Sequence, residues 1–382
     1  MRKWIRACCI IFLLFMSGVK VYAQEAELEA EIEQVQESLF SYFDFDELNE
    51  LMGELYPEEK MDFFETVKAM ISGKIEVCAD TVNQLVLDQV NYAFRTNRKL
   101  LGQMLILMIF SAVFTNFSNV FENKQIAEIG FYMIYMLMLT MGVKSFDIAV
   151  QWAEEGIRHL TTFMEVLYPM YFLAVSLSKG LASSSTFYGL ALLLIFLVEY
   201  VILTVLLPMI QVYIMVRFMN GISEEEYLSK FSELMETGAG WILKALLGIV
   251  IGLNIIQGMI APAIDTVKRS VVSRSAEAIP GIGDALGGAT EVVLGTAVLV
   301  KNGIGAAGAV VSIGICVIPV IQILMLTVFY KVSAAIVQPV ADKRMVECIS
   351  SVGEGCQLLL KVIFAVAVLF LLTIAIVSSA TS

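Results

Sequence analysis

The sequence is poor in the residues that most enzymes place in a catalytic site. Of its 382 residues, only His159 is a histidine, and 16% are charged. The GxxxxGK[ST] phosphate loop, the HExxH of zinc proteases and the GxSxG of serine hydrolases do not occur in it. We therefore expect no nucleotide hydrolysis, no hydrolytic activity of these kinds and no cofactor. His159 lies beside an amphipathic turn, where an interfacial role is expected.

Cysteine is too scattered to indicate a metal site. Six cysteines are present, and no two of them form a CxxC pair. We interpret them as small apolar residues. Residues 303–308 match GxGxxG, but no strand precedes them and apolar segments flank them. We attribute this match to helix packing rather than to dinucleotide binding.

Long hydrophobic runs dominate the remainder of the chain. Hydrophobic residues make up 58% of it and the mean hydropathy is +0.79, so we expect an all-α, polytopic membrane protein in contact with lipid. The net charge of −12 is concentrated in residues 24–88, which contain 18 Asp or Glu and 3 Lys. Nucleic-acid binding is not expected, because it relies on clustered Lys and Arg.

The N-terminus has the layout of a secretory signal. Three basic residues within the first six precede an apolar run that ends with small residues at positions 21 and 23. Residues 1–23 are expected to be a signal peptide, with an uncleaved anchor helix as the alternative. Residues 24–97 would then form a small acidic helical domain outside the cytoplasm. Its aromatic faces either bind a partner or bury one another.

Seven segments are apolar and close to the roughly 20 residues that a bilayer-spanning helix needs. Four fall in residues 98–218 and three in residues 239–382, with an amphipathic helix at the membrane surface over residues 219–238. The fourth is expected to continue past Pro208 to Phe218, with a kink at the proline or an interfacial extension. The segments are about 100–118, 127–143, 161–178, 187–208, 241–261, 305–330 and 358–378.

The most distinctive stretch, residues 278–311, is apolar and rich in glycine yet carries charges. We expect a broken or re-entrant helix here, because proline and glycine flank it on both sides. If residues 285–300 also cross the membrane, the protein has eight spans instead of seven. Asp284 and Glu291 are two turns apart and share one face. The candidate functional residues are Pro280, Gly281, Gly283, Asp284, Gly287, Glu291, Lys301 and Asn302.

Charges at membrane depth cost roughly 2.5 to 3.5 kcal/mol each on insertion scales, so these side chains should face protein or water. For the three charged residues of the glycine-rich stretch, a transport role and a structural ion pair both stay open. Glu165 and Glu199 are secondary candidates. Glu165 can instead reach the membrane interface, and Glu199 can form an interhelical pair or stay protonated.

The stretch AIPGIGDALGGATEVVLGTAVLVKNGIGAAG at residues 278–308, with the following apolar run that contains Pro319, resembles the stage III sporulation protein AE family of endospore-forming bacteria. The resemblance covers most of the chain. It implies a multipass component of the channel-like apparatus in the mother-cell membrane that surrounds the forespore. The implied partners are the other stage III sporulation A complex proteins, including a secretion-type ATPase and ring-forming subunits, and indirectly stage II sporulation protein Q.

Two functional interpretations remain. The first is a membrane subunit of a transport or secretion complex, acting as export gate or scaffold and supporting forespore development. The alternative is an ion-coupled secondary transporter acting alone, for which broken, glycine-rich helices with acidic residues are the expected signature. Small-residue faces such as Gly248 and Gly252 are compatible with a homo-oligomer, although they can equally serve packing within one chain.

Overall fold

The computed structural model describes residues 34–55, 62–73, 124–179, 181–222, 227–276, 283–339 and 341–380, together with scattered positions between 87 and 113. The described residues form helices and connecting turns. The helices are α3 (Asp46–Leu55), α4 (Phe63–Ile71), α6 (Lys124–Lys179), α7 (Leu181–Val201), the π-helix η1 (Ile202–Leu206), α8 (Leu207–Asn220), α9 (Ser229–Ala276), α10 (Gly283–Val337) and α11 (Lys343–Ala380). The predicted signal peptide lies outside the described residues.

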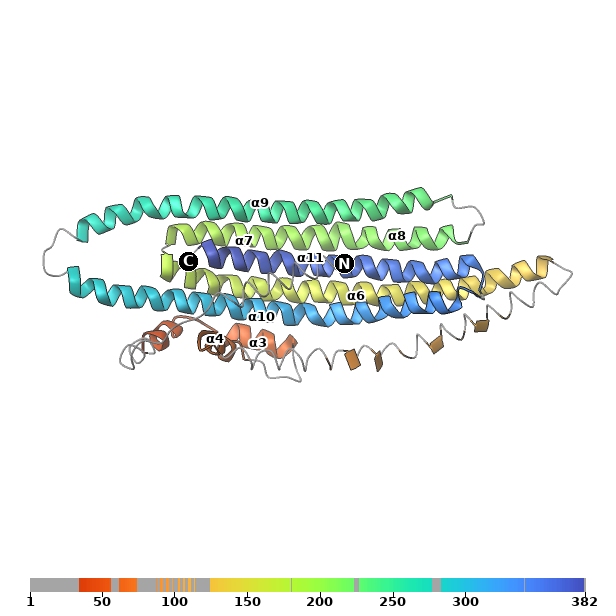
Figure 1. The fold of residues 1–382 in the computed structure, drawn as a ribbon, viewed down its shortest axis with the longest axis horizontal. Coiled ribbons are helices and arrows are strands. Elements are labelled where there is room, and N and C mark those ends of the chain that lie inside the picture. The colour runs from red at the N-terminus through yellow and green to blue at the C-terminus, as the bar shows by residue number, and fades with distance from the viewer. Residues whose placement is uncertain are drawn as a thin grey trace.

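Five long rods make up the bundle, each antiparallel to the one before it in the chain: α6, the α7–η1–α8 rod, α9, α10 and α11 (Figure 1). Within the described residues, five helices are long and apolar enough to cross a membrane. The 56 residues of α6 extend over about 84 Å, nearly three times the about 30 Å of a bilayer core. The rods therefore extend well beyond the core of any bilayer that lies across their axis.

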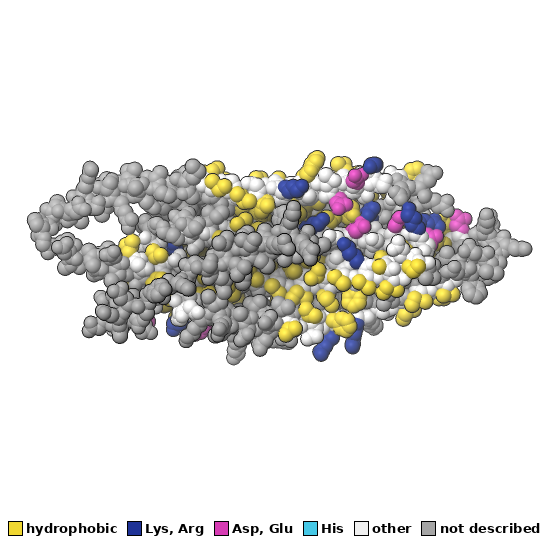
Figure 2. All heavy atoms as spheres, in the orientation of Figure 1, with side chains coloured by type: hydrophobic (Ala, Val, Ile, Leu, Met, Phe, Trp, Pro, Cys, Tyr) yellow, Lys and Arg dark blue, Asp and Glu magenta, His cyan; other side chains and the backbone are white. Residues whose placement is uncertain are grey.

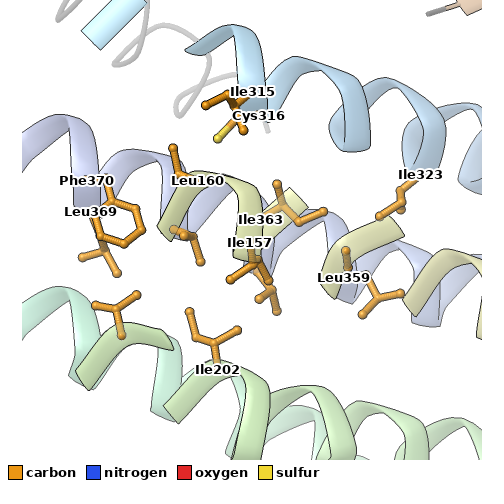
Figure 3. Close-up of a cluster of buried hydrophobic side chains, with 14 of the residues drawn as sticks. Ile157, Leu160, Ile202, Ile315, Cys316, Ile323, Leu359, Ile363, Leu369 and Phe370 are labelled. Atoms are coloured by element: carbon orange, nitrogen blue, oxygen red, sulfur yellow. The ribbon is translucent and has the colours of Figure 1, made fainter. Parts of the chain in front are cut away.

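The interior of the bundle is filled by aliphatic and aromatic side chains from all five rods. Figure 3 shows part of this core, where side chains of α6, η1, α10 and α11 point toward one another. Three cysteines, Cys316, Cys348 and Cys356, are buried free thiols within it, as expected for small apolar residues. The labelled members of the cluster are Ile157, Leu160, Ile202, Ile315, Cys316, Ile323, Leu359, Ile363, Leu369 and Phe370.

The prediction of two separate segments at 127–143 and 161–178 is wrong, because both lie in the continuous helix α6. The polar stretch between them looked like a connection between spans. Its apolar residues nevertheless recur at helical spacing, and Ala149, Ala153 and Ile157 are buried. Exposed residues such as Glu155 and Arg158 occupy other faces of the helix.

The expected continuation past Pro208 is confirmed, since helical structure runs on to Asn220. The predicted disturbance at the proline takes the form of the π-helix η1. The N–H of Leu207 bonds to the carbonyl of Ile202, one residue further back than in an α-helix. Proline has no N–H and its ring crowds the preceding turn, so the wider π turn just before it accommodates the missing bond.

The expected separate helix over residues 219–238 is also wrong. Residues 219–220 end α8, and residues 229–238 are the first turns of α9, which continues without a break to Ala276. Gly238 and Gly240 lie within this continuous helix. A glycine in a helix interior lowers the stability of the helix by only about 1 kcal/mol relative to alanine. A break in the helix would lose more than this, because it would remove backbone hydrogen bonds and side-chain packing. The sequence of the expected helix also contains a capping-box pattern, Ser223 with Glu226, which lies outside the described residues.

A continuous helix also replaces the expected broken segment. Residues from Gly283 to Val337 form α10, so the predicted break at the glycines around position 305 is wrong. These glycines serve close helix contacts instead. A Cβ at Gly308 would lie 2.6 Å from Leu167 Cδ2, and one at Gly305 would lie 3.0 Å from Tyr171 Oη. Pro280 and Gly281 lie outside the described residues.

The described part of the acidic N-terminal region packs against the bundle. The α4 helix lies against α10 (Figure 1), and Phe63 and Val67 are completely buried. The Phe63 ring contacts that of Phe163 on α6 at a centroid distance of 6.2 Å. A Cβ at Gly303 would lie 2.5 Å from Ile71 Cγ1. The aromatic faces of these helices are thus buried within the same chain.

The visible face of the molecule has an uneven distribution of side chains. Figure 2 shows hydrophobic side chains over its middle, and Lys, Arg, Asp and Glu gathered toward the right-hand end. Figure 1 places the end of α8 and the start of α11 there. Large hydrophobic residues are exposed on the rods themselves, as expected for surfaces that meet lipid rather than water. They include Met133, Leu193, Phe196, Trp241 and Ile255.

Gly156→Ala tests the close contact between α6 and α10. The new Cβ would lie 2.5 Å from Pro319 Cγ, and overpacking of this kind costs about 1–3 kcal/mol. Thermal unfolding of the purified protein in detergent should therefore show a lower Tm. As a control, Gly189→Ala on α7, where the new methyl meets nothing within 4 Å, should keep or raise the Tm, because alanine is the better helix former by about 1 kcal/mol. Equal Tm values would contradict the contact.

Candidate functional site

Lys301 is the functional candidate that the structure buries completely. It lies on α10, and its side chain is among the largest in the chain with no exposed surface. Its Nζ donates a hydrogen bond to the carbonyl oxygen of Ser378 on α11 over 3.3 Å. The hydroxyl of Ser378 in turn donates to Asn302 Oδ1 over 3.5 Å. Two adjacent candidates, Lys301 and Asn302, thus hold the same residue of α11.

The position of Ser378 in α11 explains why the buried lysine at position 301 is tolerated. The α11 helix ends at Ala380, so the carbonyl of Ser378 is one of the last four, which have no partner within the helix. The negative end of the helix dipole also lies there, and cationic side chains are favoured at such ends. Lys301 therefore supplies a donor to one of the terminal carbonyls of α11.

The side chains of the other two charged candidates of the glycine-rich stretch lie outside the described residues. Asp284 and Glu291 lie in the first part of α10. Along a straight helix, Glu291 is about 15 Å and Asp284 about 25 Å from Lys301. Ion pairs along one helix join residues three or four positions apart, so Lys301 is too far along α10 for a pair of this kind with either carboxylate, and the transport role and the structural ion pair both stay predictions. Gly283 is the first residue of α10, and Gly287 follows one turn later.

Glu199 makes the interhelical contact that was one of its open interpretations. Its Oε1 lies 4.0 Å from Arg158 Nη1, which joins α7 to α6. The same arginine binds Glu154 on α6 at 2.9 Å. Glu165, the other secondary candidate, is exposed on the surface of α6. Because Arg158 is itself 55% exposed, this pair contributes little to stability.

A second polar cluster was not predicted. Arg217 at the end of α8 forms an ion pair with Glu354 on α11, and Tyr213 donates to the same carboxylate over 3.4 Å. Ser350 Oγ lies 3.5 Å from its other oxygen. The predicted last span began at residue 358 and so left Glu354 outside it. A carboxylate four residues before a long apolar run could have indicated this pair.

The described residues contain no group of three or more His, Cys, Asp or Glu that could hold a metal ion. The candidate site is instead a set of polar contacts that join neighbouring helices. Lys301 and Asn302 join α10 to α11, Glu199 joins α7 to α6, and Glu354 joins α11 to α8.

Comparison with known proteins places this arrangement in a family. The sequence model of the family described as Stage III sporulation protein AE matches residues 61–381, which include α4 and all five long rods. This chain belongs to the stage III sporulation protein AE family. A relative, the Stage III sporulation protein AE of Bacillus subtilis (strain 168), is 25% identical over 285 residues, covering 74% of this chain and 71% of that protein. No solved structure matches the chain.

Membership of the stage III sporulation protein AE family confirms the resemblance found in the glycine-rich stretch and assigns the protein to sporulation. The matched region begins just before α4 and excludes residues 24–60, the first half of the acidic N-terminal region. The family's sequence pattern therefore covers the bundle and the helix packed on it, together with the contacts of Lys301, Glu199 and Glu354.

Truncating Lys301 should destabilise this family member strongly. Lys301→Ala leaves a cavity and a buried carbonyl without its donor, which together cost about 2–5 kcal/mol. Lys301→Met keeps most of the volume and avoids the cavity, so it should cost less, about the 1–3 kcal/mol of a polar group that loses its hydrogen-bond partner. Thermal unfolding of the purified variants measures both.

Lys331→Met is the matched control for both lysine variants. Lys331 is an exposed residue of the same helix that bonds Gln357 over 2.6 Å, and its loss should change the Tm little. An unchanged Tm for Lys301→Ala would mean that Lys301 does not fill the contact between α10 and α11.

Proposed function

We propose that this protein is a non-enzymatic, multipass membrane subunit of the channel or secretion-like complex between mother cell and forespore. The observation that carries the proposal is the family match, which spans the whole bundle from α4 to α11. Five rods that are apolar enough to cross a membrane support a position within it. We assign the protein to the mother-cell membrane around the forespore, with the acidic N-terminal region outside the cytoplasm.

The packing of the bundle supports a scaffold or export-gate role. The rods are joined through buried glycine contacts and through polar pairs between neighbours. Such contacts are what hold helices together in lipid, where apolar surfaces gain little by meeting one another. In this proposal the protein presents a firm platform to the other stage III sporulation A proteins, including the secretion-type ATPase and the ring-forming subunits.

The alternative of a secondary transporter acting alone has lost its main support. It depended on a broken helix in the glycine-rich stretch, whereas residues 283–337 form one continuous helix. The proposal and this alternative also differ in what the isolated protein can do. A subunit needs its partners, whereas a transporter works by itself.

Affinity purification from sporulating cells tests the proposal. The full-length protein carries a tag after Ser382 and is cross-linked in the membrane before extraction. We expect stage III sporulation A proteins to co-purify, and the same procedure on vegetative cells that express the tagged protein alone serves as the control. Ion-coupled solute uptake by the purified protein in liposomes would overturn the proposal in favour of the transporter.

Asp284→Asn and Glu291→Gln test whether the charged start of α10 acts in the complex. We expect the double variant to block forespore development while its abundance in the membrane stays normal, because both substitutions preserve side-chain size and remove only charge. Glu128→Gln, at an exposed position of α6, is the control and should support normal spore yield. Immunoblots of membrane fractions and counts of heat-resistant spores provide the two measurements. Loss of the double variant from the membrane would assign these carboxylates to structure instead.

A further inference from the structure

A cavity between α8, α9 and α11 has a composition that nothing in the proposed function uses. Its volume is about 220 Å³. Lys244 and Trp241 on α9 and Lys361 on α11 line it together with Glu236. The remaining lining is mainly apolar and includes Ile210, Leu243, Leu358 and Val362. The cavity thus combines two cations, one carboxylate and an aromatic ring above an apolar floor.

The two lysines are available to a ligand. Both are exposed, and neither forms an ion pair with a carboxylate in the part of the chain that the structure describes. The single carboxylate of the lining, Glu236, leaves an excess of one positive charge. A ligand that carries one negative charge therefore complements the cavity.

Both lysines also stand at the beginning of a stretch that is long enough to span a bilayer. Residues 245–264 and 362–382 contain no charged side chain, and about 20 apolar residues cross a bilayer core. Along α11, Lys361 is about 26 Å from Ser378, the residue that binds Lys301. This separation is close to the about 30 Å thickness of the core. Lys244 and Lys361 thus lie at the level where lipid headgroups begin.

The exposure of Trp241 and of the outer surface of α9 supports the placement of the two lysines at the level of the lipid headgroups. Tryptophan is enriched at the boundary between hydrocarbon and headgroups, and Trp241 is 66% exposed. Further along α9, in the direction of the apolar stretch, Ile249, Ile255 and Ile256 are exposed. Figure 1 shows α9 at the edge of the bundle. Acyl chains that leave the cavity can therefore lie along an apolar helix surface.

We propose that this cavity binds the phosphate headgroup of an anionic phospholipid, with Lys244 and Lys361 contacting the phosphate and Trp241 covering the glycerol region. The cavity is smaller than the roughly 300 Å³ at which pockets for drug-sized molecules begin, so it accommodates a headgroup and leaves the acyl chains outside. Basic pockets between membrane helices bind anionic headgroups in this way.

Native mass spectrometry of the full-length protein tests the site. The protein is titrated in detergent with phosphatidylglycerol and separately with phosphatidylcholine, whose headgroup has no net charge. We expect selective retention of phosphatidylglycerol. Lys244→Gln and Lys361→Gln should each weaken its apparent affinity about five-fold, and the double variant about 25-fold, from the contribution of one basic residue near a charged lipid surface.

Lys230→Gln is the matched control. Lys230 lies on the same helix α9, is exposed, and pairs with Glu233 at 2.8 Å outside the cavity lining. Its substitution should leave lipid retention unchanged. Equal retention of the two lipids, or an equal loss in the control variant, would overturn the proposal.

Free glycerol phosphate distinguishes a lipid from a soluble anion. If it displaced phosphatidylglycerol at comparable concentration, the cavity would bind soluble phosphate compounds, and the assignment to a lipid would be wrong. No displacement at a hundred-fold excess is the result expected for a site that also needs the acyl chains. The Tm of each variant, measured in the same detergent, should match that of the unmodified protein, because all three lysines are exposed.

Discussion

Close approach of α10 to its neighbours is the constraint on which the bundle depends. In lipid, an apolar side chain gains little free energy when it exchanges contact with lipid tails for contact with another helix. Helices therefore associate through tight packing and polar contacts. The α10 helix meets α6 at Gly305 and Gly308, and α4 at Gly303. A Cβ would collide with the facing side chain at Gly303 and Gly308 and would be tightly packed at Gly305. On α6, Gly156 receives Pro319 in the same way. The glycines that looked like breaks are the places where helices touch.

Polar contacts supply the second part of this association. The buried amino group of Lys301 meets the C-terminus of α11, and Arg217 meets Glu354 between α8 and α11. Each contact joins neighbouring rods rather than gathering charges around one open point. Removing one partner of a buried pair leaves an uncompensated polar group, whereas keeping both is close to neutral for stability. Such pairs therefore specify which helices are neighbours more than they add to the total stability.

Much of the helical content could be predicted from sequence, because apolar runs of spanning length have one stable form in a membrane. The continuation past Pro208 could also be predicted, since proline is tolerated near a helix start. The continuity of α6 and α10 could not be predicted from local signals. In α6, buried Ala149 and Ile157 alternate with charged neighbours, and in α10 the glycines face other helices. Both features depend on partners far away in the sequence.

The candidate site, too, could be predicted from sequence only in part. The charged group at position 301 was expected to face protein or water, and the structure buries it within the protein. Its partner is a backbone carbonyl at the end of another helix, which no side-chain motif can reveal. Glu354 was missed because the span was placed too late in the chain. Contacts between helices are thus set by axial register, which the sequence of one helix does not contain.

Within a single turn, α10 contacts both α4 and the last turn of α11. Lys301 contacts α11 and Gly303 contacts α4. Two residues correspond to about 200° around a helix, so the two contacts lie on nearly opposite sides of α10. A shift of α4 that carried α10 along its axis would therefore also move Lys301 relative to the last turn of α11.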